Sequence, residues 1–92
     1  MALFTPNYYG KPISEKLEDY LKTFTTVNDR KQAAKKTGVS ASTIRGIIYE
    51  GNSISENNAV AMLEVARTAI HNCTQSLHKA KQAREFFEDA AV

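Results

Sequence analysis

Several features that would narrow the class of this 92-residue chain are scarce or absent. Cys73 is its only cysteine, so the chain cannot form an internal disulfide bond, and nothing argues against a reducing compartment. No stretch approaches the roughly 18 apolar residues of a membrane-spanning helix. The first residues also lack the basic start and apolar run of a secretory signal. We therefore expect a single soluble, cytoplasmic domain without a membrane partner.

The usual residue groupings of an enzyme or a metal site are missing as well. His71 and His78 have no acidic or cysteine partner at metal-ligand spacing, and Cys73 falls on an apolar stripe like a small buried hydrophobe. The acidic residues Glu15, Glu18 and Asp19 suit the N-terminal end of a helix rather than a catalytic pair. There is no glycine-rich phosphate loop. The sequence predicts no enzyme, no metal, no cofactor and no small-molecule ligand.

Proline and glycine are concentrated at few points, and these points divide the chain. Both prolines and Gly10 lie in residues 1–12, which predicts an irregular N-terminal arm. The arm carries the aromatic residues Phe4, Tyr8 and Tyr9. They are expected either to pack on the helical body or to grip DNA or a partner subunit, with a disordered arm as the remaining possibility.

Apolar periodicity predicts helices over residues 13–24, 29–37 and 41–49. The first helix has one apolar face, made of Ile13, Leu17, Tyr20, Leu21 and Phe24, and the β-branched and polar residues 25–28 are expected to end it. Ser14 is expected to cap the first of these helices, Asn28 or Asp29 the second, and Ser40 the third. Gly38 is expected to end the second helix in the left-handed conformation.

Residues 55–89 contain neither proline nor glycine, which favours one long helix over a pair divided at residues 71–74. The predicted fold class is all-α: a helix-turn-helix domain of about four helices, with the helix-turn-helix core in residues 13–54 and a long C-terminal helix (or helix pair) for oligomerisation in residues 55–92.

The central evidence for the helix-turn-helix is the register around Gly38. Such a unit packs two short helices across a tight turn, so it needs a small residue at the crossing, here Ala34, and a glycine in the turn. The residue after the turn is apolar (Val39). Ile44 and Ile47 then give the next helix a buried stripe.

Residues 33–45 (AAKKTGVSASTIR) resemble the helix-turn-helix of bacterial and phage repressors of the Cro and lambda-repressor type, and also of the lac-repressor type. Residues 48–55 resemble the glycine-containing exit in the Cro-like group, and the likeness covers roughly residues 17–70. It implies major-groove recognition by Ser40, Ala41, Ser42, Arg45 and Tyr49, with Thr43 on a phosphate. Many family members have a glutamine at the start of the second helix, where this chain has Arg30 and Lys31.

The distribution of charge supports double-stranded DNA as the partner. The whole chain has a formal charge of +2, whereas residues 28–49 contain five basic residues and one acidic residue. The predicted DNA-binding set therefore consists of Arg30, Lys31, Lys35, Lys36, Ser40, Ala41, Ser42, Thr43, Arg45 and Tyr49.

The C-terminal segment carries a second pattern, a heptad-like seam of alternating three- and four-residue steps. One series is large (Leu63, Ile70, Leu77, then Arg84), and the other is small (Ala59, Ala66, Cys73, Ala80, ending in Phe87). The part up to about Ile70 is expected to pack on the domain core. The remainder is expected either to pair with another chain or to fold back on its own domain. The dimerisation residues predicted are Ile70, Cys73, Leu77, Ala80, Phe86 and Phe87.

Taken together, these patterns predict a homodimeric or higher-order, sequence-specific DNA-binding protein, acting as a bacterial or phage transcriptional regulator. Two other classes stay open. One is a DNA-packaging or architectural protein, such as a small terminase-like subunit that forms a ring. The other is a protein-interaction module with a helix-turn-helix fold. Particle mass and salt-sensitive DNA binding distinguish the three.

Overall fold

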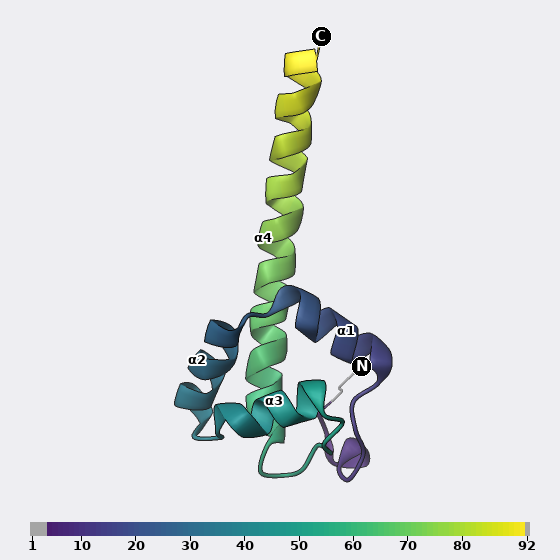
Figure 1. Cartoon of the computed structure of the whole chain (residues 1–92), viewed down its shortest axis with the longest axis vertical. Coiled ribbons are helices and arrows are strands. Elements are labelled where there is room, and N and C mark those ends of the chain that lie inside the picture. Colours follow the sequence, from purple (N-terminus) through teal and green to yellow (C-terminus); the bar gives the residue numbers. More distant parts are fainter. Residues whose placement is uncertain (1–3, 92) are drawn as a thin grey trace.

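The computed structural model describes residues 4–91, and all of the regular secondary structure in that range is helical (Figure 1). Residues 1–3 of the arm and residue 92 lie outside this range. The elements are η1 (Pro6–Tyr8), α1 (Glu15–Phe24), α2 (Val27–Thr37), α3 (Ala41–Tyr49) and α4 (Ala59–Ala91). The predicted all-α class with a long C-terminal helix is confirmed.

The starts of α1 and α3 follow the sequence prediction. Ser14 accepts a hydrogen bond from the backbone N–H of Leu17 at 3.2 Å, and Ser40 accepts one from Thr43 at 3.1 Å. Each serine hydroxyl thereby satisfies an amide that the helix leaves without a carbonyl partner. Between them, Gly38 ends α2 with φ of +77°, and its N–H donates to the carbonyl of Ala34 at 2.9 Å.

The predicted start of α2 is wrong, because its cap is Thr26 rather than Asn28 or Asp29. The Thr26 hydroxyl accepts from the N–H of Asp29 at 3.1 Å, and the Asp29 carboxylate accepts from the N–H of Thr26 at 2.9 Å. This reciprocal capping box satisfies two amides at once. It adds Val27 and Asn28 to the helix, although β-branched and polar residues had indicated a break there.

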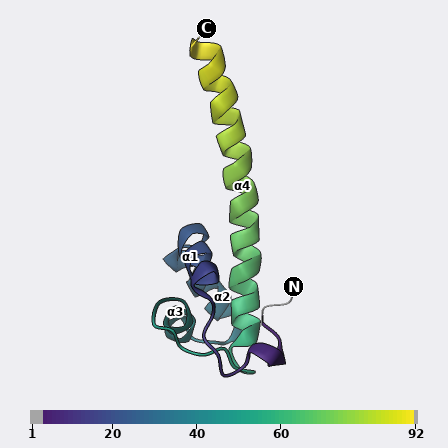
Figure 2. The same cartoon turned by 90° about the vertical axis from the view of Figure 1, so that its right-hand side faces the viewer.

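The core lies where α1, α2 and α3 pack on one side of the lower half of α4 (Figure 2). Its fully buried side chains are Leu21, Ile44, Ile47, Ile48, Met62 and Val65. The first part of α4 packs on the core mainly through Ala61, Met62 and Val65, which are buried. Of the predicted seam, Ala59 is buried and Ala66 is half-buried, whereas Leu63 and Ile70 are exposed.

The described part of the arm packs on the body, which is the first of the three possibilities expected for it. Phe4, Tyr8 and Tyr9 are half-buried against the core. The backbone of the arm is tied to the connection between α3 and α4. The N–H of Gly10 donates to the carbonyl of Ile54 at 2.8 Å, and the N–H of Ile54 donates to the carbonyl of Lys11 at 3.0 Å.

Helix α4 is a single helix, so the pair divided at residues 71–74 does not occur. Within that weak stretch, the Asn72 side-chain amide donates to the carbonyl of Phe24 at 2.8 Å and to the carboxylate of Asp29 at 3.2 Å. Beyond this tie α4 projects away from the body (Figure 1). Residues 74–90 are all exposed except the half-buried Ala83. No helix in the described range is long and apolar enough to cross a membrane.

Candidate nucleic-acid interface

The turn between α2 and α3 leaves one face of α3 free. Ile44, Ile47 and Ile48 are buried against the other helices, whereas Ser42, Thr43, Arg45 and Tyr49 are exposed. Ala41 is half-buried at the start of the helix. A short helix that presents small and hydrogen-bonding side chains at its N-terminal end is suited to enter a DNA major groove closely.

A shallow depression of about 220 Å³ lies between the start of α2 and the exposed face of α3. Five of its six lining residues belong to the predicted DNA-binding set, and they are Arg30, Lys31, Ala41, Ser42 and Arg45. The sixth is Val27, which the sequence prediction missed because it placed the start of α2 too late. The fold thus brings together residues from two helices on one concave, positively charged surface.

Tyr49 stands at the centre of three basic side chains from three helices. The distances from its ring centroid are 4.8 Å to Lys22 Nζ, 5.2 Å to Arg30 Cζ and 5.1 Å to Arg45 Cζ. These distances are within the range of cation–π attraction. We call Tyr49 and these three residues the tyrosine cluster.

The tyrosine cluster changes the roles expected from sequence. Arg30 is only 7% exposed, so it supports Tyr49 more than it reaches outward. Lys22 of α1 was not predicted, because its separation of 27 positions from Tyr49 gives no local signal. Arg30 of α2 packs on the Tyr49 ring and so links α2 to α3.

Several residues of the predicted DNA-binding set form ion pairs or hydrogen bonds within the chain. Arg45 also pairs with Glu50 at 3.1 Å, and both side chains are exposed. Lys36 lies 3.9 Å from Glu64 of α4, on the side where α2 meets α4. The Ser40 hydroxyl is occupied by the cap and lies 2.8 Å from the Thr43 hydroxyl. Lys31 and Lys35 are exposed on α2.

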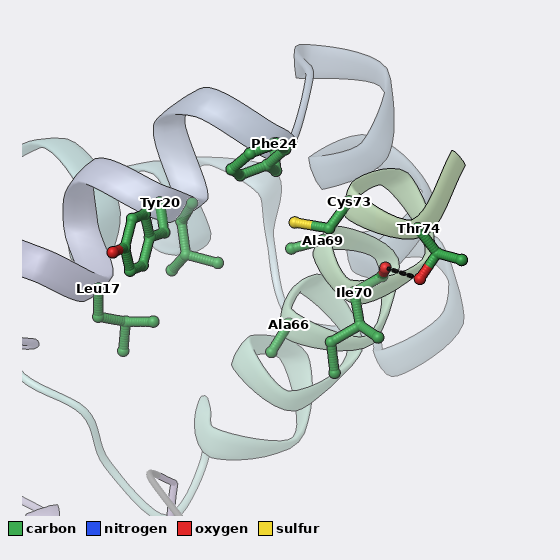
Figure 3. A pocket seen from close by; sticks show the side chains of 9 residues that line it. Leu17, Tyr20, Phe24, Ala66, Ala69, Ile70, Cys73 and Thr74 are labelled. Atoms are coloured by element: carbon green, nitrogen blue, oxygen red, sulfur yellow. Dashed lines mark hydrogen bonds between the residues drawn. The ribbon is translucent and has the colours of Figure 1, made fainter. Parts of the chain in front are cut away.

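The predicted dimerisation residues lie on the projecting part of α4 and beside it. Ile70, Leu77, Phe86 and Phe87 are 67–75% exposed, Ala80 is exposed, and Cys73 is half-buried. Ile70 and Cys73 also line an apolar groove of about 470 Å³ between α4 and α1 (Figure 3). The α1 wall of this groove consists of Leu17, Tyr20, Leu21 and Phe24, which sequence reasoning had assigned to the core-facing side of the first helix.

Neither a family model, nor a curated protein, nor a solved structure matches this chain. The site is therefore characterised by its own residues. Among the side chains that the structure describes, no group of three His, Cys, Asp or Glu is placed to hold a metal ion.

Proposed function

We propose that this protein binds double-stranded DNA sequence-specifically, with α3 in the major groove, and that it acts as a homodimeric transcriptional regulator in a bacterium or phage. The observation that carries the proposal is the single surface on which Ser42 and Arg45 of α3 meet Lys31 of α2.

Contacts to base edges and contacts to phosphates are expected to come from different residues of this surface. Arg45 is long, charged and in the middle of α3, which suits it to a guanine edge. Lys31 and Lys35 are exposed on α2, which suits them to phosphates that fix the orientation of the protein. The tyrosine cluster holds Arg45 from one side, through its contact with the Tyr49 ring.

The short length of α3 is the argument for self-association. Helix α3 has nine residues, so one copy reaches only a few base pairs. Two copies on two half-sites roughly double the specific free energy of binding.

Gel shifts at low salt with random-sequence duplex DNA test the DNA-binding part. A variant carrying Arg45→Ala and Lys35→Ala is expected to bind at least about tenfold more weakly, because binding to random-sequence DNA is electrostatic and the loss of one phosphate contact, that of Lys35, already removes roughly tenfold at low salt. Lys79→Ala is the matched control, since Lys79 is exposed on the distant part of α4. Unchanged affinity in the double variant would contradict the proposal.

The projecting α4 also favours a second candidate, an oligomeric packaging or architectural DNA-binding protein. The mass in solution, measured by light scattering, separates the two. A mass of two chains supports the regulator, and a mass of many chains supports a ring. A complete lack of salt-sensitive DNA binding would instead favour a protein-interaction module.

A further inference from the structure

Most of the exposed apolar residues on the projecting part of α4 lie along one seam, interrupted by Arg84, that runs into the α1–α4 groove. Leu77 and Phe87 lie on the same seam as Ile70 and Cys73, which line the groove. Phe86 and Phe87 pack edge to face, with 6.0 Å between their ring centroids, and are 70% and 68% exposed. These two rings leave on the order of 300 Å² of aromatic surface in water, which a partner surface is expected to cover.

The chain cannot cover its own groove with this aromatic pair. Ile70 and Phe87 are 17 positions apart on one unbroken helix, which separates them by about 25 Å. A second copy placed antiparallel brings its aromatic pair to the groove of the first, and the first does the same for the second.

We propose that two chains dimerise through antiparallel α4 helices, with Phe86 and Phe87 of each chain closing the α1–α4 groove of the other. This proposal specifies the partner and the geometry of the self-association included under the proposed function. It does not depend on DNA binding.

One register pairs the part of the seam from Ile70 to Phe87. With Phe87 opposite the partner's Ile70, Ala80 falls opposite the partner's Leu77, and Arg84 falls opposite the partner's Cys73. Leu77 and Arg84 then each meet a smaller residue, as knobs-into-holes packing requires, and Phe87 meets an apolar residue at the mouth of the groove.

The flanks of the seam fit the same arrangement. One flank consists of small residues (Ala69, Ser76, Ala83 and Ala90), which allow two helix backbones to approach closely. Ala69 lines the groove, so this is the flank on which α1 packs. Phe86 lies toward this flank, and in the antiparallel pair it therefore faces Tyr20 and Phe24 of the other chain.

Charge on the opposite flank also favours the antiparallel arrangement. Arg67 comes near Glu88 of the second copy, and opposite charges at such flanking positions select orientation. A parallel in-register pair would instead place Arg84 against its own copy and Phe87 against Phe87. It would leave both grooves open.

The unique cysteine makes the geometry testable by oxidation without DNA. In the chain carrying Arg84→Cys, the new thiol faces the partner's Cys73, so mild oxidation is expected to convert most of the protein to a covalent dimer. The wild-type protein is expected to stay uncrosslinked, because its two Cys73 residues would lie about 16 Å apart.

Two controls define the outcomes that overturn the proposal. Arg84→Cys combined with Cys73→Ser is expected to give no covalent dimer. A covalent dimer in this double variant, or in the wild type, would indicate parallel helices and overturn the antiparallel pair. A one-chain mass for the wild type by light scattering would overturn dimerisation altogether.

A second pair of variants covers the case in which Arg84→Cys does not fold. Phe86→Ser with Phe87→Ser is expected to lower the apparent mass from two chains to one at micromolar concentration, with the helical circular dichroism retained. The matched control is Val60→Ser, an exposed apolar residue of α4 outside the paired region. A dimer unaffected by the two phenylalanine substitutions would overturn the role of the groove.

Discussion

At the scale of the residue, Gly38 sets the angle at which α3 leaves α2. Its φ is +77°, and a Cβ added there would meet nothing within 4 Å. A side chain at this position therefore destabilises the fold only through the strain of the left-handed backbone conformation. We predict that Gly38→Ala lowers the free energy of unfolding by about 1–2 kcal/mol, measured by urea denaturation. Gly38→Asn should lose less, because asparagine tolerates this conformation better. Equal stability of the wild type and Gly38→Ala would contradict the left-handed conformation of Gly38.

If Arg45 contacts DNA as proposed, the acidic residue that competes with DNA for it is Glu50. Its carboxylate holds the guanidinium at 3.1 Å, so part of the free energy of an Arg45–DNA contact is spent on separating this pair. Exposed pairs are worth about 0–1 kcal/mol, so we predict that Glu50→Gln raises DNA affinity by up to about fivefold, measured by fluorescence anisotropy. Glu85→Gln removes the same charge from the distal part of α4 and should leave affinity unchanged. Weaker binding by Glu50→Gln would mean that the pair presents Arg45 to DNA instead of restraining it.

The residues whose partners lie a few positions away in the chain were the most predictable from sequence. Ser14, Gly38 and Ser40 act on amides or carbonyls within four residues, so spacing alone indicates them. The capping box of Thr26 and Asp29 was missed, although its spacing is also local, because the surrounding β-branched residues suggested a break. Lys22 had no signal, since it meets Tyr49 only through the packing of α1 on α3.

At the scale of the element, Asn72 ties α4 to the junction of α1 and α2. Its amide serves the carbonyl of Phe24 and the same Asp29 carboxylate that closes the capping box. We predict that Asn72→Ala lowers the free energy of unfolding by about 1–3 kcal/mol, because the half-buried carbonyl and carboxylate lose a donor. Asn57→Ala, in the exposed turn before α4, should change stability by less than about 0.5 kcal/mol. Similar losses from the two variants in chemical denaturation would contradict the importance of this tie.

Helix α4 also explains why its core-facing side could not be identified from sequence. It carries two adjacent apolar stripes: one with Ala61, Met62 and Val65, which is buried, and the heptad seam with Ile70 and Leu77, which is exposed. A periodic pattern indicates an apolar face but not which surface covers it. The length of the helix was predictable, because residues 55–89 contain no proline or glycine.

At the scale of the whole molecule, the chain is elongated, with principal extents of 55 × 25 × 21 Å. Much of the exposed apolar surface lies on the projecting half of α4, so stability should depend on association. We predict that the thermal midpoint rises with protein concentration for the wild type, as mass action requires for a dimer. Phe86→Ser with Phe87→Ser should remove this dependence, as measured by circular dichroism between about 2 and 200 μM. A midpoint independent of concentration in the wild type would contradict a dimer in this range.

The candidate DNA interface is also a property of the whole molecule, since it combines residues from α1, α2 and α3. The sequence predicted the central residues of this interface, because Lys31, Ser42 and Arg45 lie in a stretch that resembles a helix-turn-helix. The sequence did not predict that Arg30 packs on Tyr49 or that Lys36 lies beside Glu64. Those positions follow from how α2 packs on α3 and α4.

The salt dependence of DNA affinity tests the central claim most directly. If Lys31 and Lys35 of each chain neutralise phosphates, a plot of log affinity against log salt should have a slope of roughly −1.8 per chain. Lys31→Ala should make this slope shallower by about 0.9 per chain, and Lys79→Ala should leave it unchanged. A slope near zero for the wild type, or the same slope in Lys31→Ala as in the wild type, would contradict DNA binding through the α2–α3 surface.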